Sequence, residues 1–153
     1  MDYYERETHA NSDGSPLFCA DIDKDNETEI KSLLEKKWNC TIKSFGKLCP
    51  VDFYALRDNR ICAVIELKTR SHAHNRYSDV FLNLRKWFCL MLSENGLGCP
   101  ALFVVKFIDK IGYVRVGQID VKNISLGGCS RVVKSNTDIE PVINVPIANF
   151  VWL

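Results

Sequence analysis

The sequence predicts a single α/β domain in which helices flank a central mixed β-sheet. Two segments carry apolar residues at helical spacing, and the short run between them at residues 61–67 (ICAVIEL) is almost continuously apolar, as a strand covered on both faces would be. Further strand-like runs follow the second helical segment. The chain has 153 residues, 46% of them hydrophobic, which is enough to bury one core.

The first 24 residues are polar and acidic, and they are expected to form an arm ahead of a domain spanning residues 25–153. Residues 1–30 carry two basic and nine acidic side chains, whereas residues 31–86 carry twelve basic and five acidic ones. The chain start is unlike a signal peptide and no run is apolar enough to span a membrane. We therefore expect a cytoplasmic protein, and any nucleic acid would bind at the basic middle of the chain.

The first helix is expected to begin at Asp25 or Asn26, either of which suits an N-cap. Ile30, Leu34 and Trp38 then recur at helical spacing and would face the sheet. A short strand around residues 41–47 follows this helix.

Two β-rich runs on either side of Asp58-Asn59 predict an antiparallel hairpin, because this pair suits a tight two-residue turn. The second arm is the apolar run at residues 61–67, and Glu66 is expected where that strand leaves the core. A second helix is predicted over residues 77–95, ended by Gly96 and Gly98. Residues 101–108, 113–119 and 141–153 predict the remaining strands.

Seven cysteines are scattered singly through the chain, without a paired spacing that suits zinc. An odd number also argues against a secreted disulfide framework. Small buried apolar groups are the simplest interpretation, so no redox or zinc-dependent function is assigned to them.

Three side chains at the hairpin suggest chemistry. Asp52 lies in one arm and Glu66 in the other, fourteen positions apart, so strand pairing can bring both carboxylates to one end of the sheet. Lys68 shares a face with Glu66 because side chains alternate along a strand, and Leu67 points the other way. Carboxylates hold the hard cations that phosphodiester hydrolysis uses, and a neighbouring ammonium can stabilise negative charge on a transition state.

The segments Pro50-Val51-Asp52 and Glu66-Leu67-Lys68 resemble the signature of the PD-(D/E)xK nuclease superfamily. The resemblance implies a restriction-endonuclease-like αβββαβ core over about residues 26–108. It departs from the pattern at Val51, which separates the proline from Asp52. Proline shapes the chain and does not ligate metal, so the assignment is unaffected.

The same resemblance implies the site residues. Asp52, Glu66 and the Leu67 carbonyl would bind one or two Mg²⁺ or Mn²⁺ ions, and Lys68 would act on the nucleophile. A carboxylate from the first helix would assist through water, for which Glu27 is preferred and Glu29 is the alternative. A structural ion pair at Glu66 and Lys68 is the competing interpretation. For Glu27 and Glu29, the competing interpretation is a favourable interaction of an acidic first turn with the helix macrodipole.

The implied function is a metal-dependent endonuclease acting on DNA, with structure-specific cleavage and a homodimer as compatible features. The likeness extends to small phage-type and Holliday-junction-resolvase-like members, and a phage-encoded member is expected in the host cytoplasm. The alternative is an inactive nucleic-acid-binding module of the same fold. Preference for DNA over RNA and internal over terminal cutting stay open. Five basic residues are expected to contact phosphates: Lys43, Lys47, Arg70, Arg76 and Lys86.

Overall fold

The computed structural model describes residues 21–127 and 140–153, so most of the expected acidic arm lies outside the described residues. The elements are α2 (Asp21–Trp38), β1 (Thr41–Ser44), β2 (Phe53–Arg57), β3 (Arg60–Thr69), β4 (Asp79–Asn83), α3 (Leu84–Leu97), β5 (Ala101–Lys106), β6 (Ile111–Arg115), β7 (Ile124–Gly127), β8 (Glu140–Pro146) and β9 (Val151–Trp152), with short 3-10 turns at Val116–Gln118 and Ile147–Asn149.

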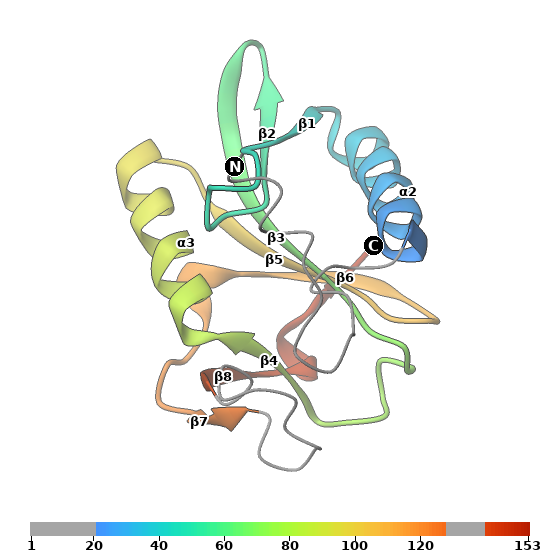
Figure 1. Ribbon diagram of the computed structural model, residues 1–153, viewed down its shortest axis with the longest axis vertical. Helices are drawn as coiled ribbons and strands as arrows, with labels where there is room; N and C mark the ends of the chain where they lie inside the picture. Colours follow the sequence, from blue (N-terminus) through green and yellow to red (C-terminus); the bar gives the residue numbers. More distant parts are fainter. Residues whose placement is uncertain (1–20, 128–139) are drawn as a thin grey trace, which may run out of the picture.

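A six-stranded sheet in the order β1-β2-β3-β5-β6-β9 forms the centre of the molecule (Figure 1). Its neighbours are antiparallel except β3 and β5, which run parallel because α3 lies between them in the chain. A smaller sheet in the order β4-β8-β7 lies beside the first turns of α3. This arrangement confirms the predicted α/β class and mixed sheet.

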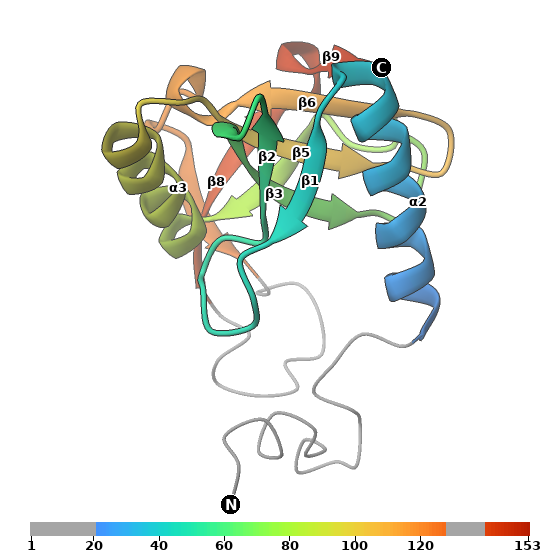
Figure 2. The same cartoon turned by 90° about the horizontal axis from the view of Figure 1, so that it is seen from above.

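The two helices cover opposite faces of the large sheet (Figure 2). On one face, Ile30 and Leu34 of α2 pack in a buried cluster with Ile65 of β3. On the other, Leu90 of α3 is fully buried in a cluster that includes Val64 and residues of the smaller sheet. Consecutive residues of β3 therefore face different helices, which explains why that strand is apolar throughout.

The hairpin between β2 and β3 turns at Asp58 and Asn59, as predicted. Both residues have positive φ, 51° and 58°, which asparagine and aspartate tolerate better than most side chains. The pairing is regular near the turn and then shifts by one residue, so that Leu56 pairs with Ile61 but Ala55 pairs with Ala63. Cys62 is the extra residue of this β-bulge.

The predicted limits of both helices were wrong at their starts. Helix α2 begins at Asp21 rather than near Asp25, and residues 21–24 contain no proline or glycine that would stop it. Residues 79–83 form β4 instead of the first turns of the second helix. Val80 and Leu82 alternate into the core, and pairing with residues 142–146 of β8 outweighs the local helical pattern. Asn83 then caps α3 by accepting a hydrogen bond from the Arg85 amide.

Helix α3 ends as predicted, with Gly98 in the left-handed conformation at φ 65°. Strand β3, in contrast, does not end at Glu66. Its pairing with β5 continues to Thr69, which keeps Glu66 inside the strand and only 6% exposed. Within the described part of the chain, no helix is both long and apolar enough to cross a membrane.

Candidate active site

Asp52 and Glu66 lie side by side where β2 begins. Phe53 pairs with Ile65 in the antiparallel hairpin. Asp52 precedes Phe53 and Glu66 follows Ile65, so the two carboxylates lie opposite one another. The Leu67 amide donates a hydrogen bond of 3.1 Å to Asp52 Oδ2. This bond holds the Asp52 carboxylate against β3 and confirms that the hairpin joins these two positions.

A lysine from α3 binds both carboxylates at once. Lys86 Nζ lies 3.1 Å from Asp52 Oδ1 and 3.0 Å from Glu66 Oε2. The sequence placed Lys86 among phosphate-contacting residues, whereas the structure places its ammonium within the acidic pair. Whether Lys86 faces β3 depends on where α3 begins, and the sequence pattern placed that start at the wrong residue.

Burial and crowding shift the pKa values in this cluster. Burial, reinforced by the negative charge of Asp52, raises the pKa of Glu66 to about 7 despite the nearby Lys86. Burial lowers the pKa of Lys86, but the charges of Glu66 and Asp52 outweigh it and the pKa is raised. Glu66 therefore carries an energetic penalty when ionised, a feature typical of functional carboxylates.

Lys68 lies on the same face of β3 as Glu66. Burial, followed by the positive charge of Arg70, lowers the pKa of the Lys68 ammonium. Its ammonium nitrogen is 5.3 Å from the centroid of the Phe81 ring, and Arg70 Cζ is 4.7 Å from the same centroid. Phe81 was not singled out in the sequence, because residues 79–83 were assigned to a helix and not to a strand facing β3.

The two candidate helix carboxylates have different surroundings. Glu29 is 73% exposed on its side chain and binds Lys106 Nζ at 3.0 Å. Glu27 is half-buried, and burial together with the charge of Asp52 raises its pKa. Glu27 therefore lies close enough to Asp52 for the charge of that carboxylate to act on it, while Glu29 is paired with Lys106.

The donor set suits a hard cation. Residues 21–127 and 140–153 hold no group of three or more His, Cys, Asp or Glu side chains placed to bind a metal ion, so Glu27 does not complete a three-carboxylate cluster. Asp52 and Glu66 nevertheless direct one oxygen each at a single positive charge, the Lys86 ammonium. Mg²⁺ is commonly bound by one or two carboxylates with water and substrate phosphate, so the chemistry of this pair suits such an ion, and the Leu67 carbonyl stays a predicted ligand.

The other predicted phosphate contacts are spread around this cluster. Lys43 on β1, Lys47 in the following loop and Arg76 before β4 are exposed. Arg70 is half-buried against Phe81. Lys43 and Arg76 make no ion pair with Asp52 or Glu66 within the described residues, so their contribution would be to binding of a long substrate.

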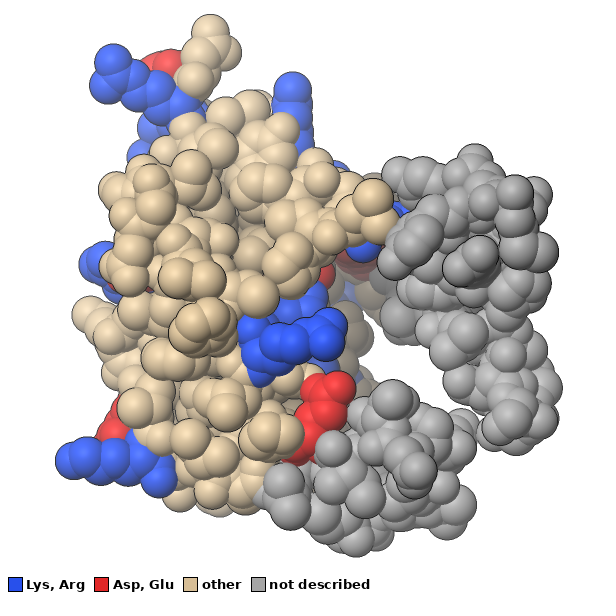
Figure 3. All heavy atoms as spheres, turned by 60° about the vertical axis from the view of Figure 1, so that its left-hand side comes forward, with Lys and Arg blue, Asp and Glu red and all other residues tan. Residues whose placement is uncertain are grey.

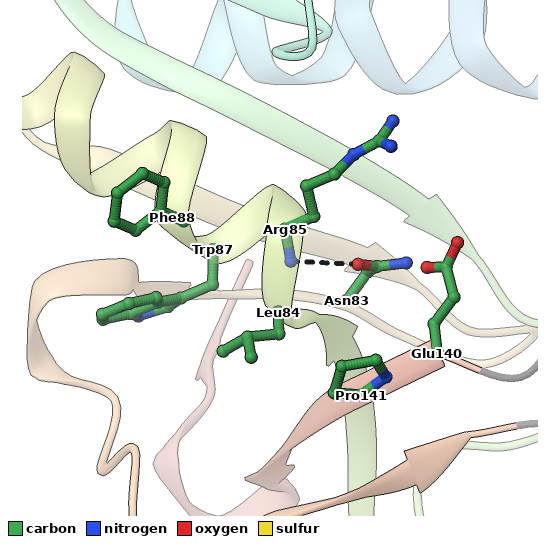
Figure 4. A pocket seen from close by; sticks show the side chains of 7 residues that line it. All are labelled: Asn83, Leu84, Arg85, Trp87, Phe88, Glu140 and Pro141. Atoms are coloured by element: carbon green, nitrogen blue, oxygen red, sulfur yellow. Dashed lines mark hydrogen bonds between the residues drawn. The ribbon is translucent and has the colours of Figure 1, made fainter.

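A pocket of about 630 Å³ lies near the start of α3, but no residue of the acidic cluster lines it (Figure 4). Its lining is mainly apolar and includes Leu84, Trp87, Phe88 and Pro141. The face of the molecule seen in Figure 3 is largely uncharged, with basic and acidic side chains gathered in a few places. Arg85 and Glu140 also line it, but neither belongs to the acidic cluster, so no reaction is assigned to this pocket.

A mixed sheet with Asp52 directly before one strand and Glu66-Leu67-Lys68 on the next matches the pattern of the PD-(D/E)xK class of nucleases. Residues 15–153 match the family described as "Phage putative PDDEXK endonuclease", and the chain belongs to that family. No curated protein matches the sequence.

Among solved structures, the chain is similar to Hjc of Archaeoglobus fulgidus, a Holliday junction resolvase from an archaeal hyperthermophile. The identity is 14% and the TM-score is 0.48, over 80% of this chain and 91% of that chain.

Proposed function

We propose that the protein is a Mg²⁺- or Mn²⁺-dependent endonuclease that hydrolyses phosphodiester bonds in DNA. The observation that carries this proposal is the convergence of Asp52 Oδ1 and Glu66 Oε2 on one cation, with Lys68 on the same face of β3. Membership of an endonuclease family supports the reaction type, and the basic character of residues 31–86 supports a nucleic-acid substrate.

Each residue has a distinct role in this proposal. Asp52, Glu66 and the Leu67 carbonyl would hold the ion, which supplies an activated water and neutralises charge on the phosphate. Lys68 stabilises the negative charge that builds on the phosphate oxygens, because its ammonium lies in a half-buried site where such interactions are strong. Glu27 faces the site from α2 and orients water near the carboxylates.

Lys86 balances the charge of the acidic pair. Two carboxylates brought together in a half-buried site repel one another unless a cation lies between them. The Lys86 ammonium provides that cation in the metal-free protein, and it is free to contact a substrate phosphate once the carboxylates bind another cation. Lys43, Lys47, Arg70 and Arg76 add affinity along the substrate without reading its sequence.

A cleavage assay with a matched pair of variants tests this proposal. Supercoiled, linear, branched and single-stranded DNA are incubated with Mg²⁺, Mn²⁺ or EDTA, using Asp52→Asn and, as the control, Asp58→Asn. Asp58 is an exposed carboxylate of the same hairpin, and asparagine also tolerates its positive φ.

We expect cleavage with either metal, none in EDTA, a loss of at least about a hundredfold in Asp52→Asn, and unchanged activity in Asp58→Asn. Cleavage that persists in EDTA, or equal activity of the two variants, would overturn the metal-dependent mechanism. Binding without cleavage of any substrate would instead assign the chain to inactive nucleic-acid-binding proteins of this fold. The predicted homodimer is tested separately by sedimentation.

A further inference from the structure

Phe81 is an aromatic residue that the hydrophobic core does not explain. It lies on β4 between Val80 and Leu82, whose side chains are buried, and its own side chain points to the opposite face. The residue is 40% exposed, and its ring meets Lys68 and Arg70, the two cationic residues at the end of β3. Packing of the core alone therefore does not account for a phenylalanine at this position.

Among the described residues, no carboxylate lies within ion-pair distance of the Lys68 ammonium, although the charges of Glu66 and Asp52 act on it from farther away. Asp52 Oδ1 and Glu66 Oε2 bind Lys86, and Asp52 Oδ2 accepts from the Leu67 amide, so three of the four oxygens of the acidic pair have other partners. Lys68 Nζ instead lies over the ring of Phe81, 5.3 Å from the ring centroid. The face of an aromatic ring attracts a cation through its quadrupole at this distance.

An aromatic ring and a carboxylate differ in how many N–H donors of a bound ammonium they leave available. A carboxylate that held Lys68 would accept one or more of its three N–H donors and would neutralise its charge. The ring orients the ammonium without accepting a conventional hydrogen bond. The ring does not neutralise the charge, so the N–H donors that point away from it remain for oxygens of the substrate or of the attacking water.

We propose that Phe81 is a positioning residue that holds the Lys68 ammonium beside the acidic pair while leaving its N–H donors for the substrate. This inference rests on the nuclease function proposed above. It assigns to β4, which was not expected as a strand, a part in arranging the site. Arg70, which directly follows β3, contacts the same ring and helps to hold Phe81 in place.

Steady-state cleavage by three variants tests this role. Phe81→Tyr retains the ring, Phe81→Leu removes it at similar volume, and Phe88→Leu is the matched control, since Phe88 is a 56% exposed phenylalanine on α3. We expect Phe81→Leu to lower kcat about two- to thirtyfold with KM within twofold, and Phe81→Tyr and Phe88→Leu to stay near the parent. In a Lys68→Met background, Phe81→Leu should have no further effect.

A rise in KM at constant kcat would overturn the proposal, because the ring would then act through substrate binding by Arg70. Equal kcat values for Phe81→Leu and Phe81→Tyr would also overturn it. Thermal melts establish that each variant is folded.

An NMR measurement separates this inference from the nuclease function itself. The Lys68 side-chain methylene resonances, assigned with Lys68→Arg, should show a ring-current shift that disappears in Phe81→Leu and persists in Phe88→Leu. If the parent protein fails to cleave while this shift is present, the nuclease function is wrong but the contact is real. If the shift is absent, the positioning role is refuted whatever the activity.

Discussion

Replacing Glu66 with glutamine should stabilise the metal-free protein at neutral and alkaline pH. Burial and the charge of Asp52 raise the pKa of Glu66 from its ordinary value of 4.5 to about 7, so the folded protein holds this proton more tightly than the unfolded chain does. The contribution of Glu66 to stability is therefore complete below pH 4.5 and is lost as the pH rises through 7. At 1.36 kcal/mol for each pKa unit, the full penalty is about 3 kcal/mol.

Glutamine has the shape of the protonated carboxyl group and does not ionise. In EDTA at pH 8, we expect the free energy of unfolding of Glu66→Gln to exceed that of the parent by up to about 3 kcal/mol, and the difference to vanish near pH 4. Urea unfolding followed by tryptophan fluorescence at pH 4, 6 and 8 measures this quantity. Glu29→Gln, at a 73% exposed carboxylate, serves as the control and should change stability by less than about 1 kcal/mol at each pH.

The result that would refute this reasoning is a difference between Glu66→Gln and the parent that does not change with pH. Such a result would mean that the folded and unfolded states bind the Glu66 proton equally well. A Glu66→Gln protein less stable than the parent at pH 8 would show that the ion pair with Lys86 outweighs the cost of burying the carboxylate.

Two further predictions concern the charge balance of the acidic pair and the packing of β6 against β9. Lys86→Met removes the ammonium between Asp52 and Glu66, so we expect a lower melting temperature in EDTA and a larger rise on adding Mn²⁺ than in the parent; equal rises would contradict the charge-balancing role. A Cβ at Gly112 would meet the Trp152 ring at 2.7 Å, whereas one at Gly96 would meet nothing within 4 Å. Gly112→Ala should therefore lose at least about 1 kcal/mol of stability in urea unfolding, while Gly96→Ala in α3 should gain up to about 1 kcal/mol, and similar values for the two would be the contrary outcome.

The parts of the fold that could be predicted are those that depend on local pattern. The continuous apolar run of β3, the Asp58-Asn59 turn and the glycine that ends α3 each have a local physical cause. Strand β4 lacks such a signal, since its pairing partner, β8, lies about sixty residues later in the chain. Long-range pairing of this kind overrides the helical spacing that residues 79–83 also satisfy.

The same distinction applies to the candidate site. Asp52, Glu66 and Lys68 could be grouped because one hairpin and one strand relate them. The contact of Lys86 with the carboxylates and that of Phe81 with Lys68 join elements whose relative placement only the folded chain defines. Glu27 was preferred over Glu29 from helix geometry, and its catalytic role stays a prediction.

The bulge at Cys62 has a consequence for spacing in related sequences. In a hairpin with a two-residue turn, directly opposed residues are an odd number of positions apart, as Arg57 and Arg60 are here. Asp52 and Glu66 are separated by an even number, so one unpaired residue between them is required for their carboxylates to lie level. A homologue with the same turn and an odd interval between its two acidic residues should therefore have a straight ladder, and the parity of the interval alone identifies which hairpins contain the extra residue.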